Sequence, residues 1–359
     1  MNRGPVLIMA GGTGGHVYPA LAVAESLRAR SQDVVWLGTH RGIEARVVPA
    51  AGIDVEWVSI RGVRRKGALA VLVAPLQIAW AVMQSLAVMW RRRPSAVLGM
   101  GGFVSGPGGV AAWLTRRPLL VHEQNAVPGL TNRLLARLAR VVLQAFPGSF
   151  NAHAETVGNP VRESIAAVPP PRERFAGRSG PMRLLVLGGS QGALSLNRTV
   201  PQALALLPEN ARPQVRHQCG ERTADIAKAA YADNGVDAEI VTFIEDMADA
   251  YAWADFVICR SGALTVAELC AAGCAAILVP YPAAVDDHQT ANATPMHESG
   301  AGVIIQECEM SAESLASLVT GFSERDSLLA RAEKARALAN PDSLTRITEH
   351  CLAQAGGAA

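Results

Sequence analysis

The chain has 359 residues, of which 50% are apolar and 18% charged. It is therefore long enough for two domains and too apolar to be disordered. Aromatic residues make up only 5% of the chain, which argues against a nucleic-acid-binding protein built on base stacking. The six cysteines form no Cys-x-x-Cys pair, so neither a zinc site nor a disulfide framework is expected, and a reducing compartment fits best. No signal peptide is expected either, because a glycine loop directly follows the first apolar run.

The charge is divided unevenly between the two halves. Residues 1–160 carry 17 Lys and Arg against 7 Asp and Glu, whereas residues 161–359 carry 16 against 24. Such an asymmetry in charge gives information about binding partners and not about the fold. The N-terminal half is expected to face something anionic, which leaves nucleic acid, a phosphorylated substrate or an anionic membrane leaflet open.

Apolar runs alternate with amphipathic segments along the chain, the βαβ rhythm of doubly wound parallel sheets. The first series predicts a helix over 19–30 and strands over 5–9, 34–37, 96–98 and 119–121. A second series restarts the rhythm, with strands over 183–187, 215–217, 239–243, 256–259 and 276–279. Between them, VPPPRERFAGRSGP (168–181) reads as a linker. Two α/β domains joined in this way place a cleft between the carboxyl ends of their sheets.

Residues 68–90 contain no charged side chain and are flanked by RGVRRKG and RRR. The length alone allows a membrane span, and a core helix is the plain alternative. Pro75, Gln77 and Gln84 interrupt the run, so we favour a helix whose outer face, with Trp80, Met83 and Trp90, lies in the lipid interface. Seven basic residues would hold it at an anionic surface: Arg61, Arg64, Arg65, Lys66, Arg91, Arg92 and Arg93.

Three glycine-rich loops, at residues 11–16, 101–106 and 188–192, follow predicted strands. Exposed N–H groups at such positions, together with a helix N-terminus, bind phosphate, although close packing of a helix on a sheet also requires glycine. No Gly-Lys pair occurs, which excludes a Walker-type NTPase. No acidic residue follows the second strand, which disfavours NAD.

The segment CRSGALTVAE (259–268) carries a more specific signal. A strand ends and a helix begins at Ser261 and Gly262, so free N–H donors are available to a diphosphate. Glu268 lies two turns into that helix, where its carboxylate would accept ribose hydroxyls; a solvated helix glutamate is the alternative. The combination predicts a nucleoside diphosphate site.

Six motifs in order, GGTGGHVYPALAVA, MGGFVSGP, HEQNAVPG, VGNPVR, LGGSQGA and CRSGALTVAE, resemble the MurG family over residues 5–350. The resemblance implies a GT-B fold, in which two Rossmann-like doubly wound parallel-sheet domains (1–163 and 164–340) face a deep cleft. A helix over about 341–359 would pack back on the first domain.

This resemblance also implies an activity and a location. The enzyme would be an inverting glycosyltransferase that moves N-acetylglucosamine from UDP-N-acetylglucosamine to the muramoyl 4-hydroxyl of undecaprenyl-pyrophosphoryl-MurNAc-pentapeptide, in peptidoglycan synthesis. It would be attached peripherally, through an anionic membrane surface, to the cytoplasmic face of the cell (inner) membrane.

Site residues follow from the same resemblance. Asn125 would bind the donor sugar, Arg162 and Ser190 its diphosphate side, and Ile244 the uracil. The remaining implied binding residues are Thr13, Gly14 and Gly15 in the first loop, Ala263, Leu264, Thr265, Val266 and Glu268 at the nucleotide, and Gln289. His288 stands where the family has the first Gln of a pair.

Inverting transfer needs a base on the acceptor hydroxyl. His16 is the first candidate, because a helix N-terminus favours the neutral imidazole, and Glu123 is the rival. No Asp-x-Asp occurs, so no metal and no cofactor are expected. Two other functions stay open: a UDP-N-acetylglucosamine 2-epimerase, and a non-enzymatic membrane scaffold that binds nucleotide sugars. None of these three functions involves nucleic acid, so no nucleic-acid partner is expected.

Overall fold

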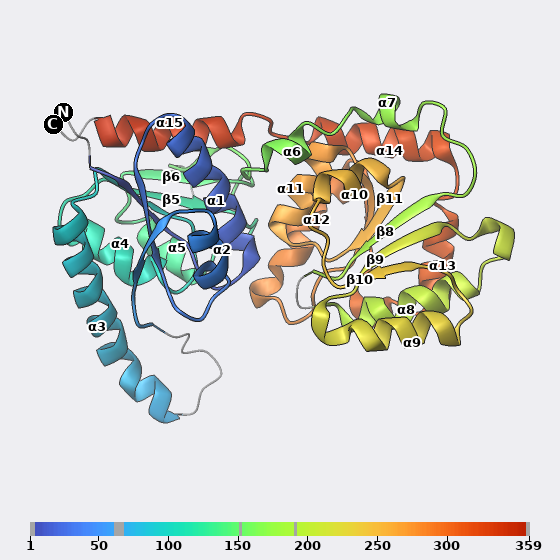
Figure 1. Ribbon diagram of the computed structural model, residues 1–359, viewed down its shortest axis with the longest axis horizontal. Coiled ribbons are helices and arrows are strands. Elements are labelled where there is room, and N and C mark those ends of the chain that lie inside the picture. Colours follow the sequence, from blue (N-terminus) through green and yellow to red (C-terminus); the bar gives the residue numbers. More distant parts are fainter. Residues whose placement is uncertain (1–3, 61–67, 151–152, 190–191, 357–359) are drawn as a thin grey trace. The chain divides into compact units, whose positions relative to one another are not determined.

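The computed structural model describes residues 4–60, 68–150, 153–189 and 192–356. They form two compact units, Met1–Val161 with Asp342–Ala359, and Arg162–Pro341. Each unit contains one parallel β-sheet flanked by helices (Figure 1). The predicted α/β class with two Rossmann-like sheets is confirmed.

The N-terminal unit has a seven-stranded sheet in the order β3-β2-β1-β4-β5-β6-β7. Val6 pairs with Val34 on one side and with Ala96 on the other, so the strand order reverses between β1 and β4. Ligands bind open parallel sheets at the carboxyl ends of the strands beside such a reversal. The strands are β1 (Val6–Met9), β2 (Val34–Gly38), β3 (Asp54–Trp57), β4 (Ala96–Gly99), β5 (Leu119–Glu123), β6 (Val141–Gln144) and β7 (Glu155–Thr156).

Alternate residues of β1 face opposite layers of the core. Val6 and Ile8 pack in one layer, and Leu7 and Met9 pack in the other. The first layer contains α1 and α15, which lie side by side in Figure 1 although they come from opposite ends of the chain. The helices of this unit are α1 (Gly14–Ala29), α2 (Glu44–Ala50), α3 (Ala68–Arg92), α4 (Ser105–Leu114), α5 (Leu130–Leu135) and α15 (Ser343–Gly356).

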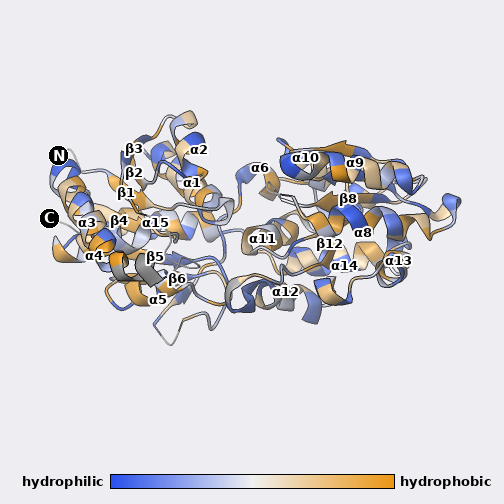
Figure 2. Cartoon of the chain, turned by 90° about the horizontal axis from the view of Figure 1, so that it is seen from below, coloured by the Kyte–Doolittle hydropathy of each residue, from blue (hydrophilic) through white to orange (hydrophobic). Residues whose placement is uncertain are grey.

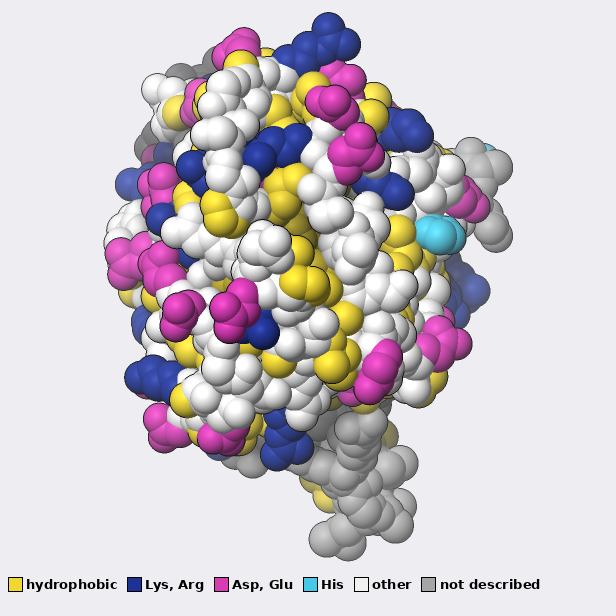
Figure 3. Space-filling view, turned by 90° about the vertical axis from the view of Figure 1, so that its right-hand side faces the viewer, with side chains coloured by type: hydrophobic (Ala, Val, Ile, Leu, Met, Phe, Trp, Pro, Cys, Tyr) yellow, Lys and Arg dark blue, Asp and Glu magenta, His cyan; other side chains and the backbone are white. Residues whose placement is uncertain are grey.

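The C-terminal unit repeats this arrangement with the order β10-β9-β8-β11-β12-β13, so its reversal lies between β8 and β11. The strands are β8 (Arg183–Leu187), β9 (Gln214–Gln218), β10 (Glu239–Val241), β11 (Phe256–Cys259), β12 (Ala275–Leu278) and β13 (Gly302–Ile304). The helices are α6 (Glu163–Ala166), α7 (Pro171–Phe175), α8 (Leu194–Ala205), α9 (Ala224–Asp233), α10 (Met247–Trp253), α11 (Ala263–Ala272), α12 (His288–Glu298), α13 (Ala312–Thr320) and α14 (Arg325–Ala337). On the face of the molecule drawn in Figure 3, acidic and basic side chains are interspersed.

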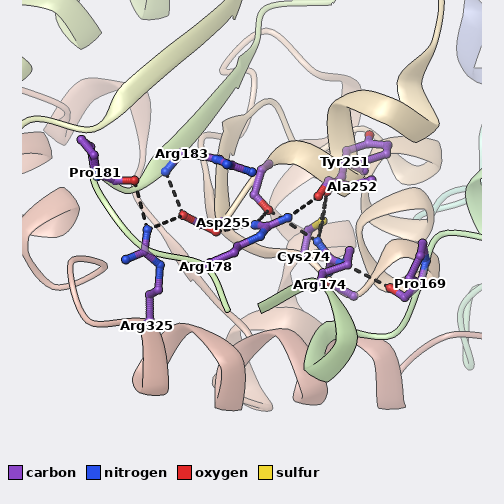
Figure 4. A network of polar contacts seen from close by, with 12 residues as sticks. Pro169, Arg174, Arg178, Pro181, Arg183, Tyr251, Ala252, Asp255, Cys274 and Arg325 are labelled. Atoms are coloured by element: carbon purple, nitrogen blue, oxygen red, sulfur yellow. Dashed lines mark hydrogen bonds and ion pairs between the residues drawn. The ribbon is translucent and has the colours of Figure 1, made fainter. Parts of the chain in front are cut away.

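The prediction of a linker over 168–181 is wrong, because this segment packs into the C-terminal unit. Arg174 is buried and donates to the carbonyl oxygens of Tyr251 and Ala272 at 3.1 and 3.0 Å. Arg178 forms an ion pair with the buried Asp255 (Figure 4). Arg174 and Arg178 hold the segment against the ends of neighbouring elements, because each guanidinium offers five N–H donors.

Other differences concern short elements. Helix α1 begins at Gly14 and not near residue 19, so Pro19 lies inside the helix. Strands β3, β6, β7 and β13 were not predicted. Strand β3 is short and carries Asp54 and Glu56, so it has no apolar run.

Helix α3 covers the uncharged segment 68–90. Ala81, Ser85 and Val88 are buried at helical spacing, on a helix that packs against α4. Leu76, Trp80 and Trp90 are 73%, 61% and 65% exposed, respectively. Figure 2 shows hydrophobic residues on both α3 and α4. The interpretation as an ordinary core helix is therefore wrong.

Among the described residues, one helical stretch, Val73–Arg92, has the length and composition needed to cross a membrane, and 28% of an apolar window of 18 residues within it is buried. Of the seven predicted basic flanking residues, Arg61, Arg64, Arg65 and Lys66 lie outside the described residues. Arg91 and Arg92 form ion pairs with Glu56.

Candidate active site

The first glycine loop follows β1 at the reversal of the N-terminal sheet. Glu44 is fully buried behind it and accepts hydrogen bonds from the N–H of Gly12 at 3.0 Å and the hydroxyl of Thr39 at 2.7 Å. Trp36 donates from Nε1 to the carbonyl oxygen of Ala10 at 3.0 Å. The loop is thus fixed from inside the unit, while Thr13 and Gly15 are exposed.

The second glycine loop follows β4 and touches the first. Gly101 has φ +103°, and a Cβ atom there would lie 2.8 Å from Nδ1 of His16. Its N–H donates to the hydroxyl of Ser105 at 3.2 Å. Glycine is required at this position both by its positive φ and by the imidazole ring beside it.

His16 lies in the first turn of α1 and is half-buried. Its Nδ1 atom is 2.8 Å from Oε1 of Gln124. Nε2 of Gln124 is in turn 3.1 Å from Nδ1 of His122, whose Nε2 is 2.9 Å from the carbonyl oxygen of Gly158. Complete burial lowers the pKa of His122 to about 4, so this imidazole is neutral near pH 7.

Glu123, the last residue of β5, is buried, and its carboxylate accepts four hydrogen bonds. Oε1 accepts from the backbone N–H and from Nδ2 of Asn125, at 2.9 and 3.0 Å. Oε2 accepts from the N–H of Gly129 at 3.2 Å and from Nδ2 of Asn132 at 2.9 Å. An ionised carboxylate has about four acceptor positions, so Glu123 organises the loop that carries Asn125.

In the C-terminal unit, α11 begins at the carboxyl end of β11. Gly262 is its N-cap, and Asn292 Nδ2 donates to the carbonyl oxygen of the buried Ser261 at 3.3 Å. The first helical residues are Ala263 and Val266, which are buried, and Leu264 and Thr265, which are half-buried. This helix start offers N–H groups and a positive dipole end to an anion.

Glu268 is buried on α11, so the alternative of a solvated helix glutamate is wrong. Oε2 accepts from the hydroxyl of Tyr251 at 3.1 Å, and Oε1 accepts from Nη2 of Arg162 at 3.3 Å. Burial raises the pKa of Glu268 above 4.5, while Arg162 and the Tyr251 hydroxyl oppose that rise. A carboxylate in this setting has acceptor positions left for a neutral hydroxyl.

The other predicted binding residues are dispersed over the same unit. Ile244 is half-buried in the loop after β10. Gln289 accepts on Oε1 from the N–H of Tyr281 at 2.9 Å, and His288 begins α12. Ser190 lies outside the described residues.

Four residues at these loops were not predicted: Trp36, Glu44, Tyr251 and Arg260. Arg260 follows β11, where it forms an ion pair with Glu307 and donates to the Ser195 hydroxyl at 2.9 Å. Trp36 and Tyr251 lie in apolar patterns that indicate only core. Among the described residues, no group of three or more His, Cys, Asp or Glu side chains has a metal-binding arrangement.

Comparison with known proteins matches two family models. Residues 6–144 match the glycosyltransferase family 28 N-terminal domain, and residues 183–347 match the glycosyltransferase family 28 C-terminal domain. A UDP-N-acetylglucosamine–N-acetylmuramyl-(pentapeptide) pyrophosphoryl-undecaprenol N-acetylglucosamine transferase from Alkalilimnicola ehrlichii is 58% identical, over 98% of this chain and 99% of that protein. The transferase of the same name from Thiobacillus denitrificans is 56% identical, over 98% of each chain.

Among solved structures, the crystal structure of Acinetobacter baumannii MurG superposes with a TM-score of 0.85 at 40% identity and covers 98% of this chain and 99% of its own. A structure described as a putative UDP-N-acetylglucosamine 2-epimerase from Listeria monocytogenes has a TM-score of 0.66 at 15% identity, over 97% of this chain and 95% of its own. This second likeness concerns the fold alone. The predicted GT-B fold is confirmed. By identity over nearly its whole length, the chain belongs to glycosyltransferase family 28 and, within it, to the MurG family of N-acetylglucosamine transferases.

Proposed function

We propose that this chain transfers N-acetylglucosamine from UDP-N-acetylglucosamine to undecaprenyl-pyrophosphoryl-MurNAc-pentapeptide, a step of peptidoglycan synthesis. The observation that carries the proposal is the 58% identity to a transferase named for this reaction, over 98% of this chain and 99% of that protein. The arrangement of the site agrees, because each sheet presents a glycine loop and a helix start at its strand-order reversal.

The donor nucleotide is assigned to the C-terminal unit. There Glu268 accepts the ribose hydroxyls, and the N–H groups at residues 263–266 hold the nucleotide. Arg162 is 40% exposed while it contacts Glu268, so its guanidinium is accessible to the diphosphate as well. Ser190, Ile244 and Gln289 complete the proposed donor site.

The reacting sugars are assigned to the loops of the N-terminal unit. Thr13, Gly14 and Gly15 face them, and Asn125 hydrogen-bonds the donor sugar. Support for Asn125 comes from Glu123, which accepts from both its backbone and its side chain. An amide held in this way loses little conformational entropy when it binds a sugar.

His16 is proposed as the base that takes the proton of the acceptor hydroxyl. Its rival Glu123 is buried and already accepts four N–H donors, so removing one of them to accept a hydroxyl proton would leave a buried donor unpaired. His16 is half-buried and contacts Gln124 through one ring nitrogen, Nδ1. In a single displacement, the acceptor oxygen bonds to the anomeric carbon as the bond to UDP breaks. The acceptor proton passes to His16, and Arg162 with the start of α11 stabilises the departing diphosphate.

Attachment to the cytoplasmic face of the inner membrane is proposed through α3. Its exposed apolar side chains and the adjacent basic residues suit a helix that lies in the interface of an anionic bilayer. Because Ala81, Ser85 and Val88 are buried on the opposite face, a membrane span would strip α3 from its own unit.

The test is UDP release by the full chain, measured with and without the lipid acceptor, together with identification of the disaccharide lipid product. The proposal predicts release that depends on the acceptor and yields the N-acetylglucosaminylated lipid. Conversion of UDP-N-acetylglucosamine without acceptor would indicate the epimerase, and binding of UDP without any turnover would indicate the scaffold.

A further inference from the structure

The side chains of His122, Gln124 and His16 form a continuous row from the interior of the N-terminal unit to its first glycine loop. The row starts at the carbonyl oxygen of Gly158 and ends at the half-buried ring of His16, with spacings of 2.9, 3.1 and 2.8 Å. The backbone of the middle residue is held as well, since Asn159 Nδ2 donates to the carbonyl oxygen of Gln124 at 2.9 Å.

The direction of each hydrogen bond follows from the first one. A carbonyl oxygen only accepts, so Nε2 of His122 carries the proton that faces Gly158. The buried ring is neutral, because burial lowers its pKa to about 4. Its Nδ1 is therefore a lone pair and accepts from the amide of Gln124.

The same constraint fixes the orientation of the Gln124 amide. Its Nε2 faces two acceptors, Nδ1 of His122 and the carbonyl oxygen of His122, each at 3.1 Å. Turning the amide over would place its oxygen against a lone pair and a carbonyl oxygen, both repulsive. Oε1 thus faces His16 and accepts from Nδ1 of that ring.

We infer that Gln124 and His122 are positioning residues that hold His16 in the Nδ1–H tautomer, so that its Nε2 carries the lone pair that accepts the acceptor proton. The inference rests on the proposed function for the last step only; the tautomer itself follows from the hydrogen bonds. Gly101 supports the same ring orientation, since a side chain there would collide with Nδ1 and Cε1 of His16.

The direct test is long-range ¹H–¹⁵N NMR of the full chain labelled with ¹⁵N-histidine, in which the two neutral tautomers give distinct ring patterns. The His16 signals are assigned by their loss in His16→Ala. The expected result for the unaltered protein is the Nδ1–H tautomer at His16. The Nε2–H tautomer there would overturn the inference without any variant having to fold.

The matched variants are Gln124→Leu and Gln144→Leu. Both glutamines are buried. Gln124 contacts two histidines, whereas Gln144 donates to the Thr156 hydroxyl and accepts from the N–H of Phe150. Gln124→Leu is expected to release His16 to the Nε2–H tautomer favoured by a free histidine side chain. It should lower kcat roughly 10- to 100-fold, the usual cost of removing a group that orients a functional histidine, with the donor KM unchanged.

Gln144→Leu should change neither tautomer nor kcat. A fall of kcat in Gln124→Leu with the His16 tautomer unchanged would contradict the inference. If the unaltered protein shows the Nδ1–H tautomer at His16 but transfers no sugar, the proposed function is contradicted while the inferred tautomer is confirmed.

Discussion

Each of the two sheets contains one buried histidine, and the two differ in what they reach. His122 in β5 and His217 in β9 both have pKa values lowered by burial, to about 4 and about 3. His122 contacts Gln124 and, through it, His16. His217 bonds the hydroxyl of the buried Tyr231 at 2.9 Å, an interaction within the core of the C-terminal unit. Burial alone therefore does not distinguish the two histidines; the polar connection of His122 to His16, beside the first glycine loop, does.

The units differ in the same way as a whole. The N-terminal unit places His16, the proposed proton acceptor, at its strand-order reversal, whereas the C-terminal unit places a buried carboxylate, Glu268, beside Tyr251 and Arg162. Under the proposed function, proton transfer therefore belongs to the N-terminal unit and recognition of the nucleotide to the C-terminal unit.

The largest expected effect is that of His16→Ala. Without the base, kcat should fall by roughly 10²–10⁴ while the donor KM stays nearly constant. A variant with near-normal kcat at saturating acceptor would remove His16 from the role of base.

Glu123→Gln is the companion to that experiment, since it replaces the carboxylate by a carboxamide of the same shape, whose NH₂ group then faces two of the four N–H donors. It should lower the melting temperature and raise the donor KM through Asn125, while kcat falls far less than in His16→Ala. A fall in kcat as large as that of His16→Ala, measured at saturating acceptor, would make Glu123 the base.

Glu268→Ala tests the nucleotide side. The loss of a charged acceptor for the ribose should weaken UDP binding by roughly 1.5–3 kcal/mol, measured by calorimetry. The control is Glu298→Ala, which removes an exposed glutamate from α12 of the same unit. In the unaltered protein, UDP affinity should begin to fall on acidification above pH 4.5, because burial raises the pKa of Glu268 beyond that value. Equal UDP affinity in both variants would remove Glu268 from the site.

The sequence predicts most of the strands, because buried parallel strands are continuous apolar runs; β8 and β11 have the predicted bounds. It does not predict β3, a half-exposed edge strand with two carboxylates. Nor does it predict that 168–181 packs through Arg174, since Pro, Gly and Arg in a run also suit a solvated linker. The sequence does not predict the direction of the His122–Gln124–His16 hydrogen bonds either, because that direction depends on how the fold places β5, α1 and Gly158 beside one another.

His217→Phe should sharpen the contrast between the two histidines. The folded-state pKa of about 3 lies below the ordinary 6.5, so on acidification the unfolded chain binds a proton that the folded chain does not. Stability is thus lost as the pH falls from about 6.5 toward 3, at up to about 1.4 kcal/mol for each pH unit.

The variant should lose that part of the slope in urea unfolding measured from pH 7 to pH 4, while kcat stays unchanged. A large fall in kcat would mean that His217, too, is connected to the reaction, and the comparison would fail.

The smallest expected effect concerns the membrane. Raised salt should partly release the chain from anionic vesicles, and replacing Trp80 and Met83 with Ser should release more, because both are exposed on α3. Leu206→Ser, at an exposed apolar position of the C-terminal unit, is the control. Binding in cosedimentation that resists salt, both substitutions and alkaline carbonate would instead indicate a transmembrane segment.

The division of labour between the units is tested most directly by UDP calorimetry on His16→Ala and Glu268→Ala side by side. Our account predicts that His16→Ala binds UDP as tightly as the unaltered protein, although its turnover is lost, and that Glu268→Ala binds UDP at least tenfold more weakly. Weakened UDP binding in His16→Ala together with unchanged binding in Glu268→Ala would contradict it.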